Sequence, residues 1–195
     1  MHYLLLYLLF LPYWSGVTLN VAGLGSYSIG VTTPESLDKA VFREEEQVYA
    51  KGTLTLACSH IRLFKAPRLD MEGIRITNLS LAFYDNKLFA ISCDYSPALK
   101  NAFVGKHGQG SHLSTVSLPT CINRQDKPLL IGGDSWMNGD IQAVAIRVEG
   151  FNSDCRQEES DWLMVASRRV ITLSSDCDLG SRPYLYDRLL DGQRP

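Results

Sequence analysis

Alternation of apolar and polar residues over short segments is the feature that most constrains the fold of this 195-residue chain. Successive side chains of a β-strand point to opposite faces of its sheet, so a period of two residues predicts half-buried strands. Because the segments are short and polar turns separate them, the pattern predicts a mainly β, antiparallel domain. Strands are expected at residues 53–58, 74–76, 79–83, 88–93, 115–118, 129–131, 141–148, 162–167 and 170–173.

Two segments carry helix-start signals instead. The run Thr33-Pro34-Glu35 suits an N-cap, a first helical position and an acid in the first turn, so a short helix is expected over residues 34–48. Ser96-Pro97 predicts a second helical segment, and the glycines of residues 105–110 predict a loop. If the second helix extends to residue 107, each helix precedes three strands. An α+β fold of two tandem αβββ units is therefore the alternative fold.

The N-terminus has the pattern of a secretory signal peptide. Residues 3–11 form an apolar run of signal-peptide length, which a proline ends. A membrane-spanning helix would need about 20 mostly apolar residues, and polar residues interrupt any such window here. We therefore expect a signal peptide over residues 1–22, cleavage between Gly16 and Gly23, and a secreted domain over residues 23–195 without a membrane segment.

Charge and cysteine content narrow the functional classes. The formal net charge of −2 argues against a nucleic-acid-binding protein, which normally carries a basic surface. Export would place the five cysteines in an oxidising compartment, and their odd number leaves one outside any disulfide within the chain. No Cys or His pair has zinc-site spacing, and His107 and His112 lie in a glycine-rich segment without a third ligand nearby. We expect no metal and no cofactor.

The region from residue 141 to residue 185 carries motifs in a recognisable order. Ile141-Gln142-Ala143-Val144 begins a strand that leads to Cys155, Met164-Val165-Ala166-Ser167 follows, and Cys177 precedes Pro183-Tyr184-Leu185. This order resembles the second half of the trypsin/chymotrypsin-like serine proteases. The resemblance implies a trypsin-like antiparallel double β-barrel. Since only twelve residues follow Pro183, it also implies that the second barrel is incomplete.

The same resemblance identifies relics of a catalytic site, none of it intact. His60 corresponds to the histidine base, Lys87 stands where the orienting carboxylate is expected, and Ser181 is the remnant of the nucleophile. A lysine would repel an imidazolium instead of stabilising it. Asp85 is an alternative carboxylate, although Asp85-Asn86-Lys87 is more simply a hairpin turn. The Asp-Ser-Gly-Gly-Pro sequence that builds the oxyanion hole is lost around Ser181, so we expect no catalysis.

Cysteine pairing is a further implication of the resemblance. In the family, the cysteine that matches Cys155 pairs with one in the segment where this chain has Val165. The cysteine that matches Cys177 pairs with one on a strand that this sequence does not contain. Because both have lost their usual partners, a disulfide between Cys155 and Cys177 is expected.

The expected function is that of a secreted, non-catalytic serine protease homologue that binds or regulates an extracellular protein. Inactive members of the family in insects and other animals are the precedent for this role. Two alternatives stay open: a secreted α+β module that binds or inhibits proteins, and a weakly active serine hydrolase that uses Ser181 or Ser135. Ser135 lies in a Gly-Asp-Ser sequence similar to that of SGNH hydrolases, but no histidine follows His112 to activate it, so a turn is favoured there.

Overall fold

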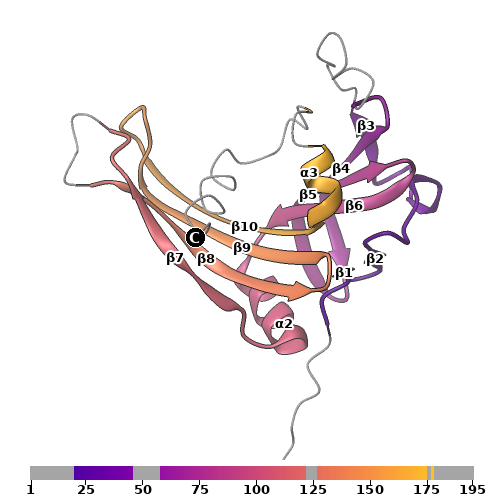
Figure 1. Ribbon diagram of the computed structural model, residues 1–195, viewed down its shortest axis with the longest axis horizontal. Coiled ribbons are helices and arrows are strands. Elements are labelled where there is room, and N and C mark those ends of the chain that lie inside the picture. Colours follow the sequence, from indigo (N-terminus) through magenta and orange to yellow (C-terminus); the bar gives the residue numbers. More distant parts are fainter. Residues whose placement is uncertain (1–19, 46–57, 122–126, 175–176, 178–195) are drawn as a thin grey trace, which may run out of the picture.

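The computed structural model describes residues 20–45, 58–121, 127–174 and 177 (Figure 1). Within these residues, two short strands precede one large sheet, and helical segments lie between and after its strands. In chain order the elements are β1 (Gly23–Leu24), β2 (Tyr27–Ser28), the 3₁₀ helix η1 (Pro34–Ser36), β3 (Arg43–Glu45), β4 (Ile61–Met71), β5 (Ile74–Tyr84), β6 (Lys87–Asp94), α2 (Pro97–His107), β7 (Ser111–Leu118), β8 (Leu129–Asn138), β9 (Ile141–Phe151), β10 (Gln157–Ser167) and α3 (Arg168–Leu173).

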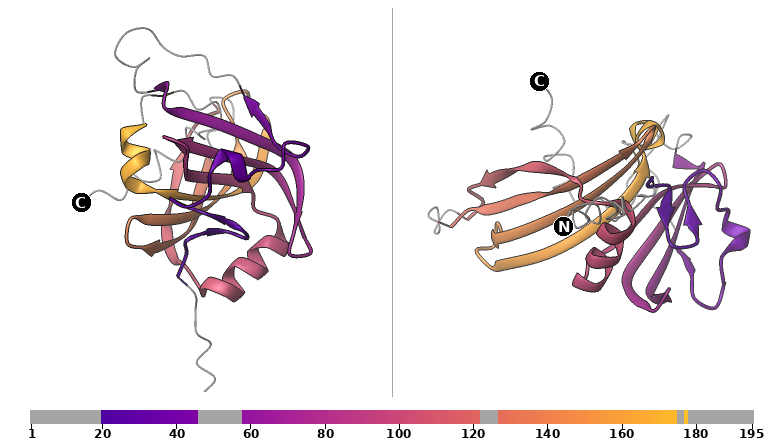
Figure 2. Two further views of the ribbon diagram at one scale, coloured as in Figure 1. Left: turned by 90° about the vertical axis from the view of Figure 1, so that its right-hand side faces the viewer. Right: turned by 90° about the horizontal axis from the view of Figure 1, so that it is seen from below.

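The large sheet has eight strands in the order β3-β4-β5-β6-β10-β9-β8-β7, and each neighbouring pair is antiparallel. The prediction of a mainly β, antiparallel fold is therefore confirmed. Among the described residues, β3 pairs only with β4 and β7 only with β8, so both edges of the sheet are open. The double barrel that the protease resemblance implies is not formed by these strands. Figure 2 shows one strongly curved sheet in its place.

The strand order divides the sheet into two similar halves. Strands β3 to β6 follow the 3₁₀ helix η1, and strands β7 to β10 follow α2. The last strand of each half, β6 and β10, pair with each other at the centre. A helical segment followed by antiparallel strands thus occurs twice, in the order of the αβββ alternative but with one more strand in each half.

Tight turns connect the strands within the first half. Asp85 and Asn86 join β5 to β6 as a two-residue loop, with φ of 48° and 59°. Positive φ at both positions is the requirement of a type I′ turn, which suits the twist of an antiparallel hairpin and tolerates Asn and Asp. The predicted hairpin at Asp85-Asn86-Lys87 is confirmed, with Lys87 as the first residue of β6.

Helix α2 packs across one face of the sheet. The Ser96 hydroxyl accepts a hydrogen bond from the Leu99 amide at 3.3 Å, and Pro97 occupies the first turn, as the sequence predicted. Leu99 and Phe103 are buried, and the Phe103 ring lies 5.1 Å from the Trp136 ring in an edge-on arrangement. The Trp136 indole N–H donates to the Gly108 carbonyl at 2.9 Å, so the end of the helix is tied to β8.

Three sequence predictions of secondary structure are wrong. The helix expected over residues 34–48 is only the single turn η1, and β3 begins at Arg43. Residues 170–173, expected as a strand, lie in α3. The loop expected from residue 105 begins later, because α2 continues to His107. Strand β4 was not predicted at all, and the strand expected at residues 53–58 lies outside the described residues, apart from Cys58.

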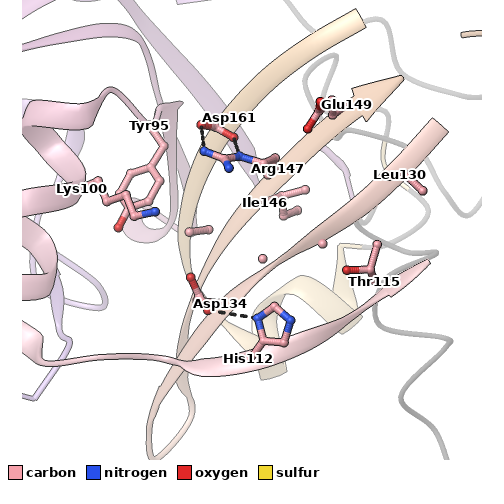
Figure 3. A pocket seen from close by; sticks show the side chains of 13 residues that line it. Tyr95, Lys100, His112, Thr115, Leu130, Asp134, Ile146, Arg147, Glu149 and Asp161 are labelled. Carbon is pink, nitrogen blue, oxygen red and sulfur yellow. Dashed lines mark hydrogen bonds and ion pairs between the residues drawn. The ribbon is translucent and has the colours of Figure 1, made fainter. Parts of the chain in front are cut away.

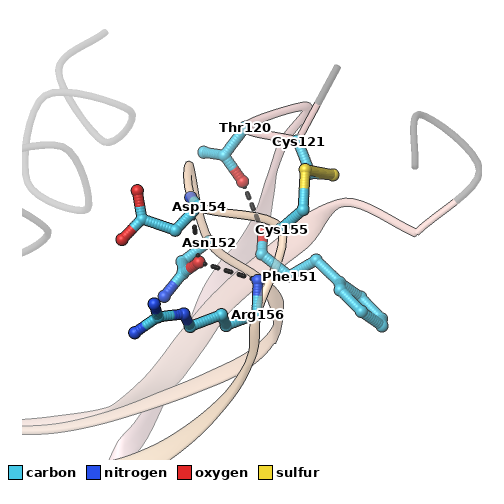
Figure 4. Close-up of a disulfide and its surroundings, with 7 residues drawn as sticks. All are labelled: Thr120, Cys121, Phe151, Asn152, Asp154, Cys155 and Arg156. Atoms are coloured by element: carbon cyan, nitrogen blue, oxygen red, sulfur yellow. Dashed lines mark hydrogen bonds between the residues drawn. A yellow bond between two sulfur atoms is a disulfide. The ribbon is translucent and has the colours of Figure 1, made fainter. Parts of the chain in front are cut away.

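The two disulfides join Cys58 to Cys177 and Cys121 to Cys155. The predicted bond between Cys155 and Cys177 is therefore wrong. Cys155 follows β9 in a loop that returns the chain next to Cys121, the last described residue after β7 (Figure 4). At the same place the Thr120 hydroxyl donates a hydrogen bond to the Phe151 carbonyl. Position along β7 and β9, and not proximity in sequence, selects the partner of Cys155.

The described chain begins with residues that belong to the core. Val21 is 3% exposed, and its carbonyl accepts a hydrogen bond from the Asn138 side chain at 2.8 Å. A signal peptide that ended at residue 22 would remove this contact, whereas cleavage before Val21 would keep it, and the predicted boundary stays a prediction. Two disulfides are compatible with export to an oxidising compartment. Among the described residues there is no helix with the length and hydrophobicity needed to cross a membrane.

Candidate functional site

An open cleft of about 270 Å³ lies on one face of strands β7 to β10, beside the start of α2 (Figure 3). Two small residues on adjacent strands, Gly132 and Ala145, lie at its base. Thr115 borders it on the edge strand β7: a Cβ atom at Gly132 would come within 3.1 Å of the Thr115 hydroxyl. The absence of large side chains at the base leaves the space above the sheet open.

The register of the strands arranges this face in rows of side chains that run across the sheet. Residues directly opposite each other in neighbouring strands share a face. From α2 outward, the rows change from apolar to charged. They are Ile91-Val165-Ala143-Trp136, then Cys93-Leu163-Ala145-Asp134-His112, then Tyr95-Asp161-Arg147-Gly132, and finally Glu159-Glu149-Leu130.

Arg147 is the centre of the charged rows. Its guanidinium donates two hydrogen bonds to Asp161, at 3.1 and 3.3 Å. Asp161, followed by Glu149 and Glu159, holds the pKa of Arg147 above its ordinary value. The Arg147 side chain is 61% exposed, so this ion pair contributes at most about 1 kcal/mol to stability. Its main effect is to fix a charged surface on a rigid strand.

Tyr95 differs from the other residues of the cleft because its polar atom is buried. The residue is 7% exposed, its backbone N–H donates to the Asp161 carbonyl, and its hydroxyl has no hydrogen-bond partner in the described protein. Burial, followed by the charges of Asp134, Cys93 and Asp161, raises the pKa of Tyr95 to about 12. The hydroxyl is therefore neutral at physiological pH and lies in a negative electrostatic environment.

Lys100 lies beside Tyr95 at the edge of the cleft (Figure 3). Tyr95 precedes the N-cap of α2, and Lys100 is the fourth helical residue. Side chains at these two positions are in contact at the start of many helices. Lys100 is exposed, and its flexible stem leaves the ammonium group in water. The cleft thus has a mobile cation at its rim and carboxylates on its strands.

A histidine and a carboxylate from the sequence prediction meet at a different place. His60 Nδ1 lies 2.6 Å from Asp85 Oδ1, and the Asp85 amide donates to the His60 carbonyl. The two side chains are 52% and 60% exposed. A carboxylate on Nδ1 orients an imidazole in the way that a catalytic triad requires. Asp85, the alternative carboxylate, is therefore the residue in contact with His60. Lys87, at the position where the resemblance expected the carboxylate, is exposed at the start of β6.

The other predicted site residues do not join this pair within the described chain. Ser181 lies outside the described residues. Ser135 lies within β8, opposite Val144, so the turn favoured there is wrong, and the chain turns only at Gly139 and Asp140. Among the residues that the structure covers, no group of three or more His, Cys, Asp or Glu side chains could hold a metal ion.

The cleft was missed by sequence reasoning, although one signal was present. Arg147, Glu149, Glu159 and Asp161 interrupt strands that are otherwise apolar on the same face, a pattern that marks an uncovered part of a sheet. Their neighbours Tyr95 and Thr115 could not be found in this way, because they come from distant segments. Comparison of the chain with protein-family models, curated proteins and solved structures finds no match.

Proposed function

We propose that this chain is a secreted, non-catalytic protein-binding module that recognises a segment of another protein in the cleft between α2 and β7. The observation that carries the proposal is the open face of β7 to β10, where charged side chains and a buried, unpartnered tyrosine hydroxyl surround a base of small residues. Concave sites with a few convergent polar groups are the usual form of a binding site.

The composition of the cleft fits recognition of a protein. Tyr and Arg are enriched at the energetic centres of protein interfaces, and Tyr95 and Arg147 lie next to each other across Asp161. The side chains of Asp134, Arg147 and Asp161 come from strands, which hold them more precisely than loops would. Two disulfides support a role outside the cell, where such a surface would meet its partner.

The proposal keeps the binding role that the protease resemblance implied and does not depend on a trypsin-like double barrel. It is closer to the first alternative, a secreted α+β module that binds or inhibits proteins. Two halves that each start with a helical segment and share one sheet support that alternative.

Selection of random heptapeptides displayed on phage tests the proposal. Peptides would be selected on the wild-type protein and then counted on two variants, Thr115→Trp and Thr172→Trp. Thr115 is exposed and borders the cleft, whereas Thr172 is exposed on α3 and provides the matched control. We expect a family of peptides whose binding is lost in Thr115→Trp and kept in Thr172→Trp. Selected peptides that all bind both variants equally well would contradict the proposal.

The contact between His60 and Asp85 favours a second candidate function, a weakly active serine hydrolase. A fluorophosphonate probe labels activated serines, and an imidazole held by a carboxylate is what activates them. Labelling that disappears in His60→Ala, and in Ser181→Ala, would support hydrolase activity. The binding proposal expects labelling no greater than that of the heat-denatured protein.

A further inference from the structure

Four carboxylates on one face of the sheet give the cleft an excess of negative charge. Glu149 and Glu159 lie directly opposite each other on β9 and β10, and Asp161 and Asp134 lie in the next two rows. Directly opposed like charges in an antiparallel pair are unfavourable. Arg147 is the only lysine or arginine among the described residues of these three rows, and it is already engaged by Asp161. His112, opposite Asp134, places its Nδ1 atom 3.5 Å from the Asp134 carboxylate. One cation therefore faces four anions across this face, with histidine counted as neutral.

A second observation points to a ligand in the same place. The hydroxyl of Tyr95 is buried next to these rows and has no hydrogen-bond partner among the described residues. Leaving a buried polar atom unsatisfied carries a free-energy penalty of about 1–3 kcal/mol, so such groups are found where a partner is supplied from outside. The negative surroundings of the Tyr95 oxygen favour a positively charged donor over an anion or a neutral acceptor.

Lys100 explains how the cleft tolerates this charge without a ligand. It lies on the rim beside Tyr95 and is, apart from Arg147, the only described lysine or arginine that lines the cleft, which His112 lines as well. Its ammonium group is exposed, so it screens the carboxylates while remaining free to move aside. A guest cation would replace Lys100 near the carboxylates, whereas a guest anion would need Lys100 as its main contact.

From these contacts we infer that the partner segment places a lysine or arginine side chain in the cleft, with its cation between Asp134 and Asp161 and donating to the Tyr95 hydroxyl oxygen. This inference rests on the proposed binding function and adds the chemistry of the partner. Glu149 and Glu159 strengthen the attraction from the outer row. A guanidinium or ammonium group has the hydrogen-bond donors that the two carboxylates and the phenol oxygen accept.

The test is a titration of the full secreted chain with three pentapeptides. Amide chemical shifts in ¹H–¹⁵N spectra are the measured signal. The peptides are acetyl-Gly-Ser-Xaa-Ser-Gly-amide with arginine, glutamate or leucine at the central position. We expect saturable shifts at Gly132, Gly133 and Ala145 with the arginine peptide. The glutamate and leucine peptides should give no saturable shift there. Equal shifts from all three peptides, larger shifts with glutamate, or no cleft shift with arginine would each overturn the inference.

Variants make the assignment specific. Glu149→Gln and Asp134→Asn should each weaken binding of the arginine peptide about two- to fivefold, and Tyr95→Phe by a similar factor. Asp70→Asn, which removes an exposed carboxylate of β4 that does not line the cleft, is the matched control and should leave affinity unchanged. Lys100→Ala distinguishes a cationic guest from an anionic one. It should strengthen binding about two- to fivefold if the guest is a cation, and weaken it if the guest is an anion.

Failure of the inferred basic side chain can be distinguished from failure of the proposed binding function. If phage selection yields cleft-dependent peptides that lack lysine and arginine, the binding function stands and the basic side chain is wrong. If selection yields only peptides that bind Thr115→Trp and Thr172→Trp equally, the binding function itself is wrong. A cleft-dependent peptide whose affinity falls at least tenfold when its lysine or arginine is replaced by glutamine supports both.

Discussion

Tyr95 shows at the scale of one residue how the proposed binding role and stability oppose each other. Its ring packs against Phe103 with centroids 6.4 Å apart, but its hydroxyl is buried without a partner. Removing an unsatisfied buried hydroxyl while keeping the ring should relieve a desolvation penalty. We therefore expect Tyr95→Phe to stabilise the free protein by about 1 kcal/mol, measured as the free energy of unfolding in urea.

Tyr84→Phe is the control for that prediction, because Tyr84 is only partly buried. A loss of stability in Tyr95→Phe would show that the hydroxyl has a bound partner in the free protein. The two results together would separate the effect of removing a buried hydroxyl from that of removing a hydroxyl on a partly exposed residue.

Cys93 is the described thiol that lies outside both disulfides, and its chemistry follows from burial. Burial, with a smaller effect of Asp94, raises the pKa of Cys93 from 9.0 to about 12. Between these two values the unfolded chain has lost the proton that the native chain keeps, so stability falls as the pH rises from about 9 to about 12. At pH 10 this loss amounts to about 1.4 kcal/mol relative to pH 8.

We expect Cys93→Ala to show a smaller loss of unfolding free energy between pH 8 and pH 10 than the wild type. The measurement is urea unfolding at the two pH values. In the native wild type at pH 8, iodoacetamide should label Cys93 only at the rate of unfolding, since a neutral buried thiol is not a nucleophile. Fast native labelling would contradict the assignment.

At the scale of elements, α2 depends on its first residues. The Ser96 side chain satisfies the Leu99 amide, one of the N–H groups that a helix leaves without an internal partner. Ser96→Ala should therefore destabilise the protein by about 1 kcal/mol. Ser114→Ala on the exposed face of β7 is the control and should change stability by less than about 0.5 kcal/mol. Urea unfolding of both variants checks the difference, and equal stability would contradict the cap.

Two elements show why local signals were insufficient. Strand β4 contains Pro67, which lacks an N–H group for the ladder, and its partner β5 contains Asn78 with φ of 53°. Both residues argue against long strands in sequence, yet pairing resumes on each side of them. Pro67 and Asn78 are themselves exposed, but Ala66, Ile76 and Leu79 beside them are buried in the core, and that burial outweighs the local irregularity.

Helix α3 is the opposite case. Its Val-Ile-Thr sequence favours a strand. In the structure, however, the Asp140 carboxylate accepts from the Arg169 amide, and the Ser167 hydroxyl accepts from the Val170 amide. Asp140 belongs to the turn after β8, thus a tertiary contact starts the helix at this point.

At the scale of the whole molecule, the two disulfides close loops of different size. Cys58–Cys177 spans 119 residues and Cys121–Cys155 spans 34. In the chain-entropy model the larger loop contributes about 5 kcal/mol and the smaller about 4 kcal/mol. We expect the double variant Cys58→Ala/Cys177→Ala to lose more unfolding free energy than Cys121→Ala/Cys155→Ala. Urea unfolding of the two double variants measures this, and the reverse order would contradict the model.

Removal of the N-terminus is a prediction about the whole chain as well. Burial of a valine side chain contributes about 1.5–3 kcal/mol, so a mature protein that lacks Val21 would be less stable. If the chain is exported with cleavage of a signal peptide, the mature N-terminus should lie between Val17 and Val21. N-terminal sequencing of the protein secreted from eukaryotic cells measures it. A mature chain that starts at Ala22 or later would contradict this prediction.

The sequence by itself determined the local features of this protein. A period of two residues placed most strands, Ser96-Pro97 placed the start of α2, and Asp85-Asn86 placed a hairpin turn. These features depend on neighbours along the chain, which the sequence displays directly. Only the tertiary structure decided that the strands form one open sheet, that Cys155 pairs with Cys121, and that the cleft exists. Alternation specifies which side chains share a face but not which strands lie next to each other. Tyr95 after β6 and Asp161 on β10 become neighbours only when the two halves of the sheet join.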